Sequence, residues 1–254
     1  MFLFSLMTLF IAAFAIKKHD VKLQNRNKIV LGAYYFNGWS KFIPGQITPR
    51  LMTGYAERKS KWGWETGTPQ AVQSQIDAAA DAGISFFSFD WYSPDSGKET
   101  FKTSHLNDAL GYYLQAPNRD RLKFNIIVCN HKRFTIGPDN WSAVCQEWIK
   151  LFKNPLYLRA NGKPLISFYT TATLVSNFGS AEAVKEAFNK FRSECKTEGL
   201  GGVTIAGCIG PMPKSVQQAK DCGFDILSEY NFHSAGFPNM QPAVYPIDSL
   251  VTGE

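Results

Sequence analysis

The most informative stretch for chemistry is Gly83–Tyr92, where one carboxylate and two aromatic side chains directly follow an apolar run. Residues 84–89 are apolar apart from two serines, which is typical of a strand buried on both faces. Asp90, Trp91 and Tyr92 follow at its carboxyl end, where ligands bind in parallel α/β folds. A charge next to a buried strand is costly unless it is paired or lies in a cleft, so this composition indicates a carbohydrate-type site. The plainer alternative is that Asp90 caps the following loop and Trp91 fills the core.

Side chains of the same kinds follow other predicted strands. We expect strands, each apolar and bounded by turn residues, over residues 28–36, 84–89, 122–129, 164–169, 202–208 and 224–227. Most of the candidate substrate-binding residues lie at or after strand ends, and one, a tryptophan, comes from the long irregular segment 40–68. These candidates are Tyr34, Tyr35, Trp64, Trp91, Tyr92, Asn130, His131, Tyr230 and Asn231.

Asp90 and Glu229 are the two carboxylates at predicted strand ends and form the candidate catalytic pair. Glycoside hydrolysis ordinarily uses two carboxylates, one on each side of the bond that breaks. If late strands are missing, however, these two acids fit hydrogen bonding to sugar hydroxyls better than catalysis.

The elements that position these residues alternate regularly along the chain. Helices are predicted from Thr68 to Gly83, over 104–114 and 140–152, from Ser180 onward and over 213–222, each between two strands. This order indicates an α/β fold with a parallel sheet. No glycine-rich phosphate turn is present, so a (β/α)8 TIM-type barrel is favoured over a doubly wound sheet. About six βα units are recognisable, and we therefore expect an incomplete barrel over residues 28–254 whose C-terminal part is missing.

Composition excludes several functional classes. The 254-residue chain is 44% hydrophobic and 19% charged, with a formal net charge of +6. Its basic residues are scattered, which argues against a nucleic-acid partner. The histidines lack metal-ligand spacing, so we expect neither a metal nor another cofactor. The five cysteines lie in apolar elements and are interpreted mostly as buried free thiols, although an exported protein could pair two of them.

The N-terminus resembles a secretory signal peptide. Residues 1–15 are almost wholly apolar and end in Ala13-Phe14-Ala15, a small-x-small cleavage pattern. We therefore expect a protein that is secreted, periplasmic or on the cell surface, with no stable membrane span after cleavage. An uncleaved anchor or a misassigned start is the alternative.

An ordered set of motifs is similar to glycoside hydrolase family 99-like proteins, a group related to endo-α-mannosidases and to WbsX-like proteins of polysaccharide gene clusters. The matching motifs are Gly32–Phe36, Trp62-Gly63-Trp64, Thr68-Pro69, Ala82–Tyr92 and Asn161–Leu165. The resemblance implies a (β/α)8 barrel and glycoside hydrolysis. The catalytic glutamate segment of that family, which lies near the last strands, has no counterpart in this sequence.

The leading functional hypothesis is therefore an exported glycoside hydrolase-like protein that acts on or binds an α-mannoside-type polysaccharide at the barrel mouth. Two alternatives stay open: a carbohydrate-binding protein without turnover, and a WbsX-like enzyme of polysaccharide assembly. Export argues against the assembly enzyme, because nucleotide-sugar donors are cytoplasmic.

Overall fold

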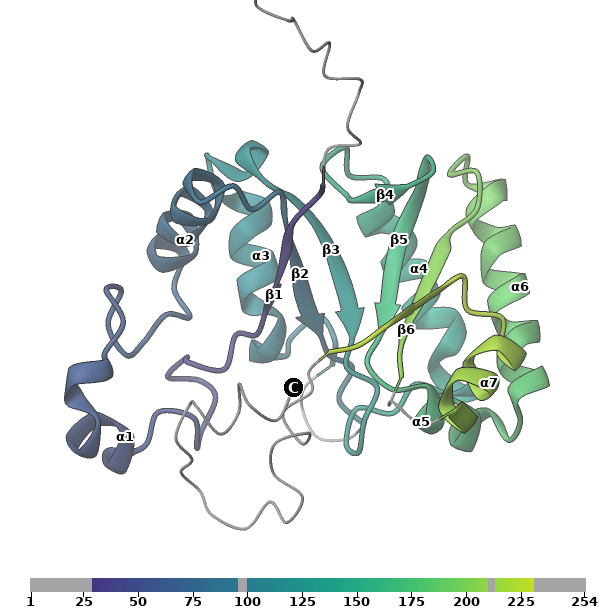
Figure 1. Ribbon diagram of the computed structural model, residues 1–254, viewed down its shortest axis with the longest axis horizontal. Coiled ribbons are helices and arrows are strands. Elements are labelled where there is room, and N and C mark those ends of the chain that lie inside the picture. Colours follow the sequence, from purple (N-terminus) through teal and green to yellow (C-terminus); the bar gives the residue numbers. More distant parts are fainter. Residues whose placement is uncertain (1–28, 96–99, 210–212, 231–254) are drawn as a thin grey trace, which may run out of the picture.

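The computed structural model describes residues 29–95, 100–209 and 213–230, and in these ranges the chain forms a parallel sheet flanked by helices (Figure 1). The parallel strands are β1 (Gly32–Tyr35), β2 (Phe86–Trp91), β3 (Lys123–Val128), β5 (Lys163–Phe168), β6 (Thr204–Cys208) and β7 (Ile226–Ser228). They are hydrogen-bonded in the order in which they occur in the chain. A doubly wound sheet would reverse its strand order at a switch point. The predicted incomplete (β/α)8 architecture is thus confirmed as a half-barrel.

The helices lie between the strands as predicted, with additional short ones. They are α1 (Pro49–Gly54), α2 (Pro69–Asp81), α3 (Asp108–Gln115), α4 (Pro138–Phe152), α5 (Thr171–Phe178), α6 (Ala181–Thr197) and α7 (Pro213–Asp221), with short 3₁₀ helices η1 (Ala56–Arg58), η2 (His105–Asn107) and η3 (Arg119–Arg121). Helix α2 shows why the sequence signals work. The Thr68 hydroxyl accepts a hydrogen bond from the Ala71 amide, Pro69 opens the first turn, and Gly83 follows the helix with a φ of 86°.

Strand β4 (Arg159–Ala160) is an element that sequence analysis missed. It pairs antiparallel with the start of β5 through a tight hairpin. Asn161 and Gly162 form the turn with φ values of 50° and 79°, the left-handed conformation that Asn-Gly hairpins require. Part of the family-like motif Asn161–Leu165 is therefore turn chemistry.

The two faces of the sheet differ in polarity because successive side chains of a strand point to opposite sides. On the outer face Phe87, Phe89 and Trp91 of β2 join a buried hydrophobic core with the side chains of the helices. On the inner face Ser88 and Asp90 of the same strand are also buried, although they are polar. A run that is largely apolar in sequence thus has a polar inner face.

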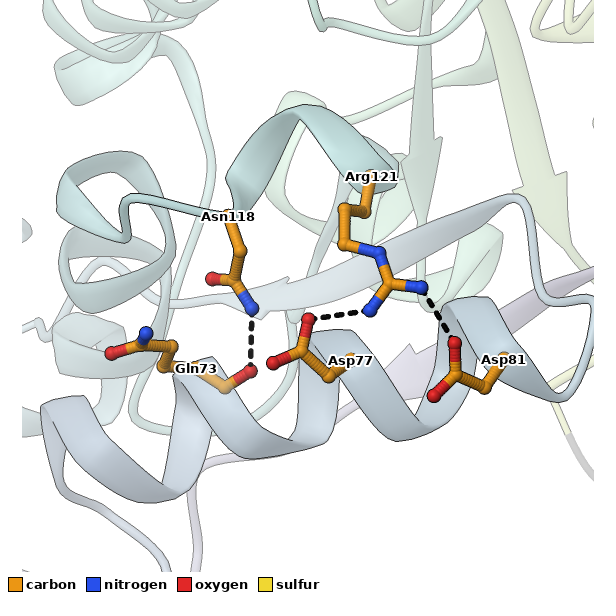
Figure 2. A network of polar contacts seen from close by, with 5 residues as sticks. All are labelled: Gln73, Asp77, Asp81, Asn118 and Arg121. Atoms are coloured by element: carbon orange, nitrogen blue, oxygen red, sulfur yellow. Dashed lines mark hydrogen bonds and ion pairs between the residues drawn. The ribbon is translucent and has the colours of Figure 1, made fainter.

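A surface network fixes the position of α2 relative to the chain entering β3 (Figure 2). The Arg121 guanidinium donates to Asp77 and to Asp81, with an N–O distance of 2.6 Å in each pair. The Asn118 side-chain amide donates to the Gln73 carbonyl at 2.9 Å. Since the charged members are solvent-exposed, the network orients these elements more than it stabilises them.

None of the helices in the described part of the chain is both long enough and apolar enough to cross a membrane.

Candidate functional site

A cavity of about 410 Å³ lies at the carboxyl ends of the parallel strands. Its lining residues come from the ends of β1, β2, β3, β5 and β7, and they are Phe36, Asp90, Tyr92, Cys129, His131, Tyr169 and Tyr230. This is the end of the sheet at which parallel α/β barrels place their active sites. The size also lies within the range of small-molecule sites.

Asp90 is the carboxylate that lines this cavity. Its side chain is on the inner face and the residue is only 6% exposed. Its Oδ2 atom accepts a hydrogen bond from the Tyr230 hydroxyl at 3.2 Å and a longer one from the Tyr92 hydroxyl at 3.5 Å. Its Oδ1 atom has no hydrogen-bond partner among the described residues. One oxygen is thus fixed by tyrosines, while the other is a buried acceptor that makes no hydrogen bond with the described residues.

Burial changes the acid–base behaviour of this carboxyl group. Removal from water raises the pKa of Asp90 to about 7, and hydrogen bonding to Tyr230, Tyr92 and, least strongly, the Cys129 thiol opposes that rise. Burial also raises the pKa of both tyrosines, so their hydroxyls keep their protons and remain donors. Asp90 therefore gains or loses its charge near neutral pH.

The two edge strands approach each other at the mouth through tyrosines. The Tyr34 hydroxyl on β1 donates to the Glu229 carbonyl at 3.2 Å, and the Tyr34 and Tyr230 ring centroids are 4.6 Å apart. Tyr230 in turn meets the Tyr169 ring edge-on at 5.1 Å. These contacts bring Tyr230 over Asp90, although 140 residues separate the two in sequence.

Glu229 contributes its main chain to this arrangement, and its side chain does not line the cavity. The candidate carboxylate pair is therefore not assembled around this space. Asp90 lines the cavity, whereas the main-chain carbonyl of Glu229 accepts one hydrogen bond from Tyr34 of the other edge strand.

Trp91 requires a correction, because it lies in the core instead of the site. It is 3% exposed and packs edge-on against Trp148 of α4 with ring centroids 5.5 Å apart. The cause is the two-residue alternation of a strand: with Asp90 on the inner face, Trp91 must lie on the outer face. The plainer alternative is thus the right one for Trp91.

Three further candidates, Tyr35, Trp64 and Asn130, do not line the cavity and instead pack within the scaffold. Tyr35 packs on the outer face against Phe87, and its hydroxyl donates to Gln75. The Trp64 ring packs against Trp39, at 5.6 Å between centroids, and does not line the cavity.

Asn130 is fully buried and clamps the end of β3 to the start of α5. Its amide nitrogen donates to the Thr170 carbonyl at 2.7 Å and to the Thr173 hydroxyl at 2.9 Å, and its oxygen accepts from the Thr170 amide at 3.1 Å. These bonds use the polar atoms of its side chain, which leaves it a structural role. Asn231 and the proposed signal peptide, residues 1–15, lie outside the described residues.

Among the other candidates, the side chains of Tyr92, His131 and Tyr230 line the cavity, and Tyr34 contacts Tyr230 beside it. Three residues that were not named as substrate-binding candidates also line it. These are Phe36, Cys129 and Tyr169, each of which directly follows its strand. A place next to a strand end suggests such residues but is not sufficient, because Glu229 also directly follows its strand and does not line the cavity. All five cysteines are buried free thiols in the structure. Within the described ranges no group of three or more His, Cys, Asp or Glu side chains could hold a metal ion.

Comparison with known proteins yields similarity in structure and not in sequence. No protein-family model and no curated protein matches this chain. The structure of the GH99 endo-alpha-mannosidase from Bacteroides thetaiotaomicron is similar, with a TM-score of 0.57 and 13% identity over 81% of this chain and 62% of that one. A second structure of that enzyme, in complex with bis-tris-propane, matches with the same TM-score and identity over 60% of its length. The chain thus spans about 60% of the length of these solved structures and shares the fold of part of their (β/α) barrel.

Proposed function

We propose that this protein binds an α-mannoside-type oligosaccharide or polysaccharide in the cavity at the barrel mouth. The observation that carries the proposal is Asp90, a nine-tenths-buried carboxylate with one oxygen held by tyrosines and the other, Oδ1, without a partner among the described residues. A buried acceptor without a donor is costly, and a sugar hydroxyl is a suitable donor.

The surroundings of Asp90 fit a sugar better than a charged or metal-bound ligand. The cavity that contains Asp90 is otherwise lined largely by aromatic side chains, those of Phe36, Tyr92, Tyr169 and Tyr230. Pyranose rings present apolar C–H surfaces and a rim of hydroxyls, so aromatic walls with few polar groups complement them. The choice of an α-mannoside is supported by the likeness in fold to an endo-alpha-mannosidase.

Glycoside hydrolysis is the second candidate, and the pKa of Asp90 favours it. At neutral pH a carboxyl group with a pKa of about 7 is protonated in a sizeable fraction of the molecules. In that form it can donate its proton to a leaving-group oxygen. Retaining and inverting mechanisms both use two carboxylates, whereas the described lining of the cavity contains one, that of Asp90. Binding is therefore the better-supported function.

Isothermal titration with an α-linked mannotetraose tests the proposal. Asp90→Asn is expected to weaken binding about 10- to 100-fold, because hydrogen bonds to charged groups contribute about 1.5–3 kcal/mol. Asp120→Asn, an exposed change of the same chemistry, serves as the control and should bind like the parent. Equal affinity of Asp90→Asn and the parent, or no binding by the parent, would refute the proposal.

The pH dependence separates binding from hydrolysis. If ionised Asp90 accepts a sugar hydroxyl, affinity rises between pH 6 and pH 8 as the group loses its proton. If protonated Asp90 acts as an acid, the release of reducing sugar falls over the same interval.

We also propose that the protein is exported, on the basis of the apolar residues 1–15 and the Ala13-Phe14-Ala15 pattern. Material recovered outside the cytoplasm should begin near Ile16 when its N-terminus is sequenced. Recovery of the protein from the cytoplasm with Met1 or the whole apolar run retained would contradict export.

A further inference from the structure

A larger groove, of about 970 Å³, adjoins the cavity and shares Phe36, Tyr92 and His131 with it. We call it the outer groove. Its other walls include Phe42, from the segment between β1 and α1, and the loop that follows β3. The two spaces therefore lie next to each other, with these three side chains common to both.

The outer groove carries two cationic side chains, Lys132 and Arg133, both exposed to solvent. Neither takes part in an ion pair with any described residue. The carboxylate among the described lining residues, Asp95, is engaged elsewhere: its two oxygens accept hydrogen bonds from the amide and the hydroxyl of Thr135. Neither cation is thus paired directly with a carboxylate of the described wall, and because Asp95 keeps its own negative charge the three side chains leave a net positive charge of one in the groove.

The loop that presents the cations is held in one shape by hydrogen bonds. The Asp95 amide donates to the Arg133 carbonyl at 3.0 Å, and the Phe134 amide donates to the His131 carbonyl at 2.9 Å. Arg133 has a φ of 79°, a left-handed conformation that residues other than glycine or asparagine seldom adopt. Such conformations persist where the surroundings impose them and are common at ligand sites.

We infer that the outer groove binds a negatively charged substituent of the glycan, a phosphate ester or a carboxylate, while a neighbouring sugar occupies the cavity. This inference rests on the proposed function. Lys132 and Arg133 supply charge complementary to the anion, and Arg presents paired donors that fit carboxylate and phosphate oxygens. Phe36 and Phe42, which are 43% and 47% exposed, supply apolar surface for the sugar ring that bears it.

The test uses a matched pair of ligands: an α-linked mannopentaose with one terminal phosphate, and the same sugar after phosphatase treatment. Titrations at 20 mM and 300 mM NaCl compare the parent with Lys132→Gln and Arg133→Gly. Glycine suits the left-handed backbone at this position, so Arg133→Gly removes the charge without new backbone strain. Lys190→Gln on helix α6, also exposed, is the control for net charge.

We expect the parent to prefer the phosphorylated sugar at low salt, and each variant of the groove to lose roughly two- to fivefold of that preference. The control should keep it. An oligomannuronate serves as a third ligand: tighter binding than that of the phosphorylated sugar identifies a carboxylate as the anion, and weaker binding identifies a phosphate ester.

Equal binding of both mannopentaoses by the parent would overturn the inference and leave the proposed function intact. A preference that Lys132→Gln and Arg133→Gly both retain would also overturn it. Failure of the parent to bind either sugar would overturn the proposed function, and the inference with it.

Discussion

Replacing Asp90 with Asn is expected to stabilise the fold at alkaline pH, although the residue is in the candidate site. Asp90 is buried on the inner face of β2, where its ionised form has lost most of its contact with water. Asn has nearly the same shape and carries no charge. The substitution therefore removes the cost of burying a carboxylate while it keeps the side chain in place.

The magnitude follows from the shift in pKa. Burial raises the pKa of Asp90 from 3.8 to about 7, and because each tenfold change in proton affinity corresponds to about 1.4 kcal/mol, ionisation costs the fold about 4 kcal/mol. The folded chain binds more protons than the unfolded chain between pH 4 and pH 7, so the stability of the parent falls as pH rises through this range. Since Asn accepts weaker hydrogen bonds from Tyr230 and Tyr92 than a carboxylate does, about 4 kcal/mol is an upper limit for the gain.

Urea unfolding monitored by tryptophan fluorescence at pH 4, 6 and 8.5 measures the effect. The difference in unfolding free energy between Asp90→Asn and the parent should be near zero at pH 4 and largest at pH 8.5. Asp120→Asn, which is exposed, should show no comparable rise with pH. If Asp90→Asn is less stable than the parent at pH 8.5, the tyrosine hydroxyls outweigh burial and the reasoning fails.

Two other substitutions probe residues that the structure moves from the site to the scaffold. Trp91→Ala should lower the unfolding free energy by about 3–5 kcal/mol in the same urea assay, because it leaves a cavity beside Trp148; a loss below about 1 kcal/mol would mean that Trp91 is not core. Asn130→Ala should lower it by about 2–4 kcal/mol, because the Thr170 amide loses its acceptor and the Thr170 carbonyl loses a donor, while the Thr173 hydroxyl keeps its bond to the main-chain carbonyl of residue 130; unchanged stability would show that the side-chain bonds do not hold α5.

Much of the fold could be predicted from sequence because its signals are local. Thr68, Pro69 and Gly83 bound α2 through capping geometry that depends on a few neighbouring residues. The alternation of strands and helices then implied a parallel sheet, and the absence of a phosphate-binding turn favoured a barrel. Strand β4 was missed because a strand of two residues carries no periodic signal, whereas α5 was missed although the equally short α3 was predicted.

The sequence predicted where the candidate site lies but not which side chains form it. Asp90 and Trp91 are adjacent in sequence and equally suited to bind a sugar, yet strand alternation sends one to the cavity and the other to the core. The largely apolar run before Asp90 does not indicate which alternate side chains face the helices and which face the cavity. Only the packing of the strand against the helices decides this.

By itself the sequence determined the parallel α/β alternation, the strand ends at which a ligand would bind and the residues available there, because each of these depends on local pattern. Only the tertiary structure decided that Tyr230 reaches Asp90 across the sheet and that Asn130 is a clamp. It also decided that the pKa of Asp90 moves to about 7, because solvent exclusion at one carboxyl group depends on residues from several strands.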